Sequence, residues 1–490
     1  MAAVVEGKKG LTKPCILLIV IAGMERFTFK GVASNMVTYL TEVAGMGNSA
    51  AARFVNNWSG FSSMLPLLIA PLADSYFHHH STILASALFY FLGLVALAST
   101  TILGDTGSKT TTTAPLTVSL HLISLGLAGY NPSLQAFAAE QLQDEDGNKS
   151  SFFQWWYFGI CCGCLAGVSV MSYIQDTFGW GLGFSIPALS MLASVLILLS
   201  ANRFYLYTAD SKPIAALQCH KSAIVQLHEL EEEKLVFQNH EEGEEVEKNR
   251  SKKQRINVVY QTGRLVIRLF PVWTLLLTFA VIFQQPATFF TKQGMTTARN
   301  IGPNFKIPPA ALQSAITVSI ILLTPIYDRC FVPLARAFTG NDKGVTVRQR
   351  MGIGMLVSVV AMAVAAVTAC KQRAEAEEMS IIWLLPQYIL LGVSDIFTVV
   401  GMQEFFYSEV PATMRTLGIA LNTSVFGCGS FFGSFLISLL EHFTGGDGHG
   451  WFSDDMREAR LDKYYWFLAG LSSLSLVVFV IFCKFDRVCN

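Results

Sequence analysis

The stretch from Trp180 to Ala201, WGLGFSIPALSMLASVLILLSA, contains 22 residues and no charged side chain. An α-helix needs about 20 apolar residues to cross the hydrocarbon core of a bilayer, so this stretch predicts a membrane-spanning helix. Eleven further apolar runs of spanning length occur, at residues 14–40, 54–74, 82–104, 114–138, 153–174, 266–290, 309–333, 351–370, 380–407, 413–440 and 464–483. The chain is therefore predicted to be an all-α membrane protein with twelve transmembrane helices.

The composition of the whole chain agrees with this prediction. Hydrophobic residues make up 52% of the 490 residues and the mean hydropathy is +0.44. Charged residues make up only 14%, against about 25% in an ordinary soluble domain. The 35 basic and 35 acidic residues give a formal net charge of zero, which argues against a nucleic-acid partner. A soluble protein is excluded, and the expected surroundings are a lipid bilayer.

The order of the runs divides the chain into two halves. Six runs precede a polar segment with an acidic block and then a basic block, and six follow it. We therefore expect an N-terminal six-helix half (1–203), a cytoplasmic charged linker (204–264) and a C-terminal six-helix half (265–490). Short echoes such as Pro71–Asp74 and Pro325–Asp328 end corresponding runs of the two halves. Parallel six-helix repeats are the architecture of major facilitator transporters, and the basic residues of the short loops place both termini in the cytoplasm.

Two groups of residues could suggest a metal site. His78–His80 form a short histidine tract, and Cys161, Cys162 and Cys164 lie close together in one apolar run. The histidines are better explained as a polar turn between two spans, and the cysteines as small packing residues of a helix. No metal, disulfide framework or cofactor is predicted.

Charged residues inside predicted spans are the strongest functional signal. Glu25, Arg26 and Lys30 lie near the middle of the first span, and Asp395 and Glu404 lie in the tenth. Charges at membrane depth are costly and usually face a substrate pathway or a partner. At 100° per residue the first three share a broad helix face, which predicts a face lining a solute cavity. The alternative is a structural ion pair between Glu25 and Arg26.

Several ordered motifs resemble those of the plant nitrate transporter/peptide transporter family, within the proton-coupled oligopeptide transporters of the major facilitator superfamily. They are ERFTFKG at 25–31, ADSY at 73–76, SFFQWWY at 151–157, QRMGIG at 349–354 and GMQEFFY at 401–407. The resemblance implies a multi-pass protein of the plasma or vacuolar membrane that works by alternating access. It implies a transporter and not an enzyme.

Three positions depart from the family pattern. The first Glu of the first-span signature is Ala22 here, and the fourth-span Lys is Asn131. That Lys pairs in the family with a tenth-span Glu, which matches Glu404, so Glu404 is expected to be unpaired and partly buried. A nitrate-binding His of one relative corresponds to Phe283. These departures predict weaker proton coupling than in relatives with the full signature.

The charge balance indicates the class of solute. The typical family cavity has three Glu, one Arg and one Lys, a formal charge of −3 + 2 = −1. Here Glu25 and Glu404 oppose Arg26 and Lys30, so the sum is −2 + 2 = 0. We expect secondary transport of a small anionic solute, such as nitrate or an acidic metabolite or hormone, with or without symport of protons. A proton-independent facilitator and a non-transporting membrane receptor are the alternatives.

Each candidate residue has an expected role in that transport. The expected roles are anion attraction for Arg26 and Lys30, a residual proton-linked group for Glu25, a gate or coupling group for Glu404, loss of the family's lysine at Asn131, and a cavity wall for Phe283.

Overall fold

The structure is a computed structural model, and it describes residues 13–76, 78–103, 113–141, 146–201, 205, 263–265, 267–303, 305–339, 345–375, 378–410, 415–444 and 450–488. Nearly all of these residues are helical. The predicted linker, 204–264, lies outside the described residues except for residues 205, 263 and 264.

The first half supplies six long helices and one short one. They are α1 (Lys13–Ala33), α2 (Met36–Glu42), α3 (Asn48–Tyr76), α4 (His79–Leu103), α5 (Thr113–Glu140), α6 (Asp146–Phe178) and α7 (Trp180–Ser200). The uncharged stretch Trp180–Ala201 forms α7, which ends one residue before Ala201. The predicted first span is broken at residues 34–35, so that α1 and the short α2 replace one continuous helix.

The second half supplies the other six spans, several of them in consecutive pieces. Residues 267–283 form a helix that continues through η5 (Gln285–Ala287) into α10 (Phe289–Met295). The next span comprises η6 (Pro309–Gln313), α11 (Ser314–Ile326), a π-helical turn (Tyr327–Phe331) and α12 (Val332–Thr339). The last four are α13 (Val347–Ala374), α14 (Leu385–Ser408) after η8 (Ile381–Leu384), α15 (Arg415–Thr444) and α16 (Leu461–Val488).

A small β-hairpin is the only sheet among the described residues. β1 (Asn300–Ile301) pairs antiparallel with β2 (Phe305–Lys306), with Ile301 opposite Phe305. Gly302 in the turn has φ +69°, a conformation that glycine adopts without steric cost. The Phe305 ring stacks on Tyr173 of α6, with ring centroids 5.9 Å apart. The hairpin of the second half therefore rests on a helix of the first half.

Nine helices in the described ranges are long and apolar enough to cross a membrane on length and composition. The other three long helices, α1, α3 and α5, fall outside that set, and α1 carries Glu25, Arg26 and Lys30. Together they account for the twelve predicted spans. The prediction of an all-α, twelve-helix membrane protein is confirmed.

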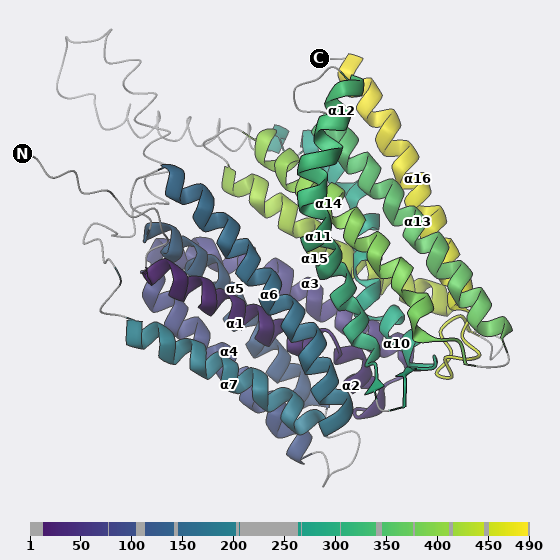
Figure 1. Cartoon of the computed structure of the whole chain (residues 1–490), viewed down its shortest axis with the longest axis horizontal. Coiled ribbons are helices and arrows are strands. Elements are labelled where there is room, and N and C mark those ends of the chain that lie inside the picture. Colours follow the sequence, from purple (N-terminus) through teal and green to yellow (C-terminus); the bar gives the residue numbers. More distant parts are fainter. Residues whose placement is uncertain are drawn as a thin grey trace, which may run out of the picture.

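The two halves form separate bundles that lie side by side (Figure 1). One cluster of buried side chains, including Tyr90 and Phe184, fills the first bundle. Two other clusters, around Tyr388 and Met355, fill the second. The bundles converge near α2 and α10 and diverge toward the side where α1 begins and α16 ends, which is called the side of the termini below (Figure 1).

Polar contacts close the converging side. Arg53 Nη1 of α3 lies 2.7 Å from Glu441 Oε2 of α15, and Ser49 Oγ donates to Glu441 Oε1 at 2.6 Å. Arg299 next to the hairpin pairs with Asp176 of α6 at 3.0 Å. These contacts join the halves on the side away from the termini.

Candidate functional site

The site is built around a buried carboxylate in the middle of α1. Glu25 is 1% exposed, and its Oε2 lies 3.3 Å from Nε of Arg26, the next residue. The Arg26 side chain keeps 30% of its surface exposed. The ion pair that was the alternative for these two residues therefore forms, with its acid buried inside the first bundle and its arginine partly exposed.

Asn131 of α5 connects both members of this pair. With its amide oriented to satisfy both neighbours, its nitrogen donates to Glu25 Oε2 at 3.0 Å and its oxygen accepts from Arg26 Nη2 at 3.0 Å. Charge-assisted hydrogen bonds of this kind are stronger than neutral ones. The residue that stands where the family has lysine thus fixes the geometry of the ion pair.

Close backbone contacts set the position of α1 in the bundle. A Cβ on Gly23 would lie 3.0 Å from the carbonyl oxygen of Gly159 in α6, and a Cβ on Gly163 would overlap the carbonyl oxygen of Gly23. On the other side, Asn131 precedes Pro132, which lies inside α5 and cannot donate a backbone hydrogen bond. Local sequence therefore brings α1 and α6 into close contact and places an interruption of the helix hydrogen bonding beside Asn131.

Lys30 lies one turn after Arg26, near the end of α1. Its charge interacts with the carboxyl group of Asp395 in α14, although the two do not form a direct ion pair within 4 Å. Tyr157 of α6 also lies within electrostatic range of Asp395. The charge balance derived from the sequence does not include Asp395. In the structure Asp395 is an acid of the second half that lies within electrostatic range of Lys30.

Phe283 lies in an aromatic cluster at the end of helix 267–283. Its ring stacks on Phe279, with centroids 5.9 Å apart, and meets Phe426 of α15 edge-on at 5.8 Å. The next residue, Gln284, donates to Ser59 Oγ of α3 at 2.7 Å. Phe283 is half-buried at a point where the two halves meet, as a wall residue would be.

The expectation for Glu404 is wrong. Its carboxylate is not an unpaired, partly buried group, because Arg350 Nη1 of α13 lies 3.7 Å from Glu404 Oε2 and 46% of the Glu404 side chain is exposed. Arg350 also stacks over the ring of Tyr327, 4.6 Å from its centroid. The reason for the error is that Glu404 was expected to lose its only partner with the lysine of the first half, whereas an arginine of its own half, 54 residues earlier, pairs with it.

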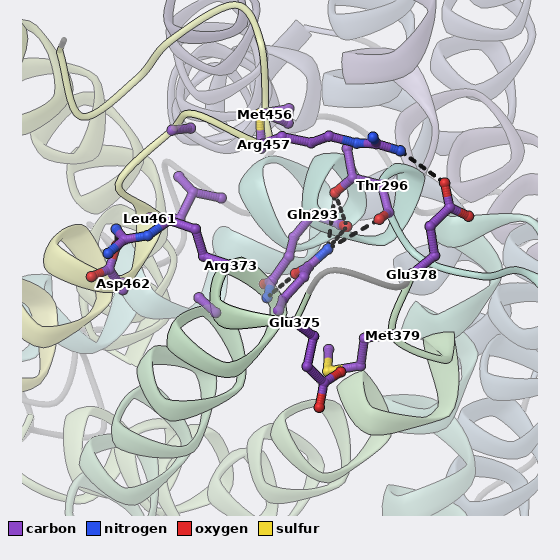
Figure 2. Close-up of a pocket in the computed structure, with 13 residues that line it drawn as sticks. Gln293, Thr296, Arg373, Glu375, Glu378, Met379, Met456, Arg457, Leu461 and Asp462 are labelled. Carbon is purple, nitrogen blue, oxygen red and sulfur yellow. Dashed lines mark hydrogen bonds and ion pairs between the residues drawn. The ribbon is translucent and has the colours of Figure 1, made fainter.

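A separate polar pocket lies at the converging side and belongs to the second half alone (Figure 2). Its cavity volume is about 150 Å³. Each of its charged lining residues has an ion-pair partner, and the pairs are Arg373–Asp462, Arg457–Glu378 and Glu375–Lys371. Because these charges are already compensated, the pocket presents little to attract a charged solute.

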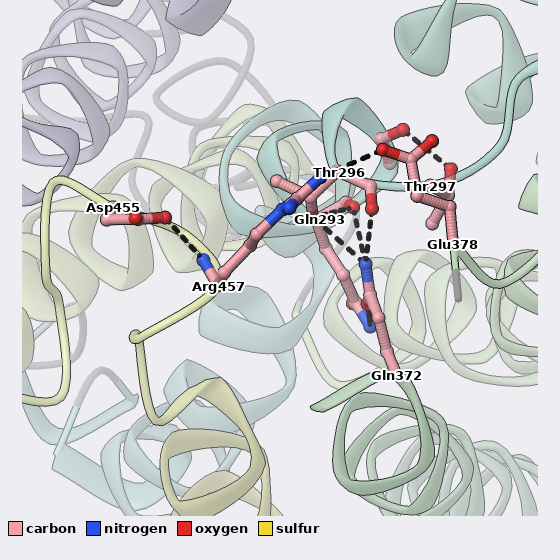
Figure 3. Close-up of polar contacts among 8 residues, drawn as sticks. Gln293, Thr296, Thr297, Gln372, Glu378, Asp455 and Arg457 are labelled. Atoms are coloured by element: carbon pink, nitrogen blue, oxygen red, sulfur yellow. Dashed lines mark hydrogen bonds and ion pairs between the residues drawn. The ribbon is translucent and has the colours of Figure 1, made fainter. Parts of the chain in front are cut away.

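The contacts around this pocket hold the segment before α16 in place (Figure 3). Gln372 Nε2 donates to Thr296 Oγ1 at 2.9 Å, and Arg457 Nη2 donates to Glu378 Oε1 at 2.8 Å. Three residues before Arg457, Asp454 Oδ1 accepts a hydrogen bond from the backbone nitrogen of Asn48 in α3 at 2.9 Å. The pocket therefore supports a contact that closes the two halves on this side.

The two possible metal motifs gain no support as metal sites. Within the described ranges, no group of three or more His, Cys, Asp or Glu side chains could hold a metal ion. His79 Nε2 instead lies 3.3 Å from Glu140 Oε1, and this contact joins the start of α4 to the end of the neighbouring helix α5. Cys161 is buried, whereas Cys162 is exposed.

Comparison with known proteins adds a family context to this geometry. Residues 80–452 match the model of the POT family. The chain is 50% identical to Protein NRT1/PTR FAMILY 5.9 of Arabidopsis thaliana, with 98% of this chain and 96% of that protein covered. It is 37% identical to Protein NRT1/PTR FAMILY 5.10 of the same plant, with 98% and 94% covered.

Solved structures show the same fold. The in meso crystal structure of the POT family transporter PepTSo matches with a TM-score of 0.77 at 18% sequence identity, over 98% of this chain and 99% of that one. The crystal structure of a peptide transporter POT in complex with sulfate matches with a TM-score of 0.73 at 18% identity, over 98% and 96%.

Proposed function

Because the chain belongs to the POT family, with relatives named NRT1/PTR FAMILY proteins, we propose that it transports a small anionic solute by alternating access. The resemblance inferred from the motifs is confirmed, as are the multi-pass membrane protein and the prediction of a transporter instead of an enzyme. The solute, the coupling ion and the membrane are the parts that we propose.

One observation carries the choice of an anion. The negative charge of Glu25 is buried and compensated by Arg26 and Asn131, while Arg26 remains 30% exposed and Lys30 follows one turn later. With Glu404 paired to Arg350, the charges near the interface are Glu25 and Asp395 against Arg26 and Lys30, again −2 + 2 = 0. The accessible groups on the α1 side are the two cations, which favours a small anion such as nitrate or an acidic metabolite or hormone.

The arrangement of the halves supports alternating access. The contacts Asn48–Asp454, Arg53–Glu441 and Arg299–Asp176 join the halves on the side away from the termini, and the bundles diverge on the other side (Figure 1). With the termini in the cytoplasm, as the basic loops predict, this is a conformation open toward the cytoplasm. We place the protein in the plasma or vacuolar membrane, and a fluorescent fusion expressed in plant cells tests which of the two.

A flux screen tests the proposal. Purified protein in liposomes is given nitrate, chloride, a dipeptide and organic acids, each with and without a pH gradient. We expect flux of nitrate or an organic acid, enhanced by an inward proton gradient, and strongly reduced by Lys30→Gln. Flux of the dipeptide alone would contradict the proposal. Anion flux indifferent to the gradient would support the proton-independent facilitator, and no flux of any solute would support a receptor.

A further inference from the structure

A groove with apolar walls runs between the start of α13 and the end of α16, which lie side by side in Figure 1. Its volume is about 530 Å³. The walls are formed by Ile353 and Leu356 of α13 and by Leu476, Phe479 and Val480 of α16. Both helices rank among the candidate spans, so the groove opens where hydrocarbon chains are expected.

One glycine lies among the residues that line the groove. Gly352 lines its floor, and a Cβ there would meet only the ring of Phe479, at 3.7 Å. At the rim, Leu356 is 52% exposed and Val480 is 44% exposed. In a membrane-spanning helix, exposed apolar side chains such as these contact lipid. The groove is therefore a hollow in the lipid-facing surface and not a part of the interior.

The end of the groove nearest the termini is cationic. Arg348 in the first turn of α13 and Lys484 near the end of α16 both line it, and none of the described lining residues is acidic. Glu409 lies 3.2 Å from Arg348 and 3.9 Å from Arg268. Arg348 and Lys484 of the lining, with Glu409 beside Arg348, sum to +2 − 1 = +1, and the N-terminal end of α13 adds a partial positive charge.

We propose that this groove binds one anionic phospholipid from the leaflet on the side of the termini. An acyl chain would lie along the apolar walls, and the phosphate would meet Lys484 and Arg348 at the membrane boundary. Basic pockets between transmembrane helices recognise anionic headgroups in this way. The net charge of the mouth favours an anionic lipid over a zwitterionic one, and the length of the apolar walls favours a lipid over a free phosphate.

The test compares two lysines on one helix. Lys484 lines the groove, whereas Lys463 is exposed at the opposite end of α16, so Lys463→Gln is the matched control for Lys484→Gln. Each protein is placed in nanodiscs containing phosphatidylcholine with increasing fractions of phosphatidylglycerol. Lipids retained after mild detergent extraction are then counted by native mass spectrometry.

We expect one retained phosphatidylglycerol per protein, bound about fivefold more weakly after Lys484→Gln and unchanged after Lys463→Gln. Gly352→Leu, which fills the floor, should reduce retention of both lipids while the protein still elutes as a folded species. Equal retention of the two lipids, or equal effects of the two lysine variants, would overturn the proposal. The proposal would also be overturned if soluble glycerol phosphate displaced the bound phosphatidylglycerol as effectively as added phosphatidylglycerol does.

Discussion

Asn131 of α5 donates a hydrogen bond to Glu25 of α1 at 3.0 Å while accepting one from Arg26, also at 3.0 Å. All three residues belong to the first half, so this arrangement can persist when the two halves move relative to each other. The loss of the family's lysine at this position therefore does not leave a gap. It replaces a cation by an amide that holds the neighbouring ion pair.

The first prediction concerns this amide. Asn131→Asp should impair initial uptake more than Asn131→Ala, because a carboxylate cannot donate to Glu25 and repels it. Each lost hydrogen bond to a charged group costs roughly 1.5–3 kcal/mol, so a loss of tenfold or more is expected. Asn57→Ala, at an exposed position of α3, is the control and should transport normally. Equal activity of all three variants would contradict a positioning role for Asn131.

The second prediction concerns the ion pair itself. Arg26→Gln leaves Glu25, which is 1% exposed, without its charged partner, whereas Glu25→Gln leaves an Arg26 that is 30% exposed. Uncompensated buried charges cost about 3–5 kcal/mol. Both variants should lose most flux, but Arg26→Gln should also lower the melting temperature of the purified protein more than Glu25→Gln does. The reverse order of melting temperatures would show that an uncompensated Glu25 charge does not destabilise the protein more than an uncompensated Arg26 charge does.

The spans were predictable from the sequence because apolar runs are a local property. Trp180–Ala201 became α7, Trp180–Ser200. The partners of polar residues could not be predicted from the sequence, because these partners depend on how helices far apart in the sequence rotate and pack. Glu404 is paired with Arg350, which no periodicity within α14 reveals. The same applies to Asn131 and Glu25, whose contact depends on how closely α1 and α5 pack.

The third prediction concerns the contact that closes the side away from the termini. Arg53 and Glu441 are 31% and 39% exposed, so their pair contributes at most about 1 kcal/mol. Glu441→Gln should shift the population toward the outward-open state by no more than about fivefold, measured from distances between spin labels on α3 and α15. The charge swap Arg53→Glu with Glu441→Arg should restore the original distribution.

The control for the Arg53–Glu441 contact is an ion pair at the end of one helix. Lys371 and Glu375 lie 3.5 Å apart on and just after α13 and do not join the halves. Glu375→Gln should therefore leave the distance distribution unchanged. A shift as large as that of Glu441→Gln would mean that any loss of surface charge moves the equilibrium, and the Arg53–Glu441 contact would not be a gate.

The last prediction concerns proton coupling. A coupling carboxylate should meet different charges as the halves move. Glu25 is held by Arg26 and Asn131 of its own half, and Glu404 by Arg350 of its own half. Asp395, in contrast, interacts with Lys30 of the other half. Protonation of Asp395 removes that attraction, so a more acidic medium favours separation of the two residues, and deprotonation favours their approach.

We therefore expect Asp395→Asn to flatten the dependence of uptake on external pH, while Glu404→Gln leaves that dependence in place. The measurement is the initial uptake rate between neutral and mildly acidic pH in liposomes held at a fixed voltage. Ala22→Glu, which restores a family carboxylate at a position now 4% exposed, should steepen the same profile. If Glu404→Gln flattens the profile and Asp395→Asn does not, the proton-linked acid is the exposed group at the end of α14. In that case the interaction of Lys30 with Asp395 only joins the halves.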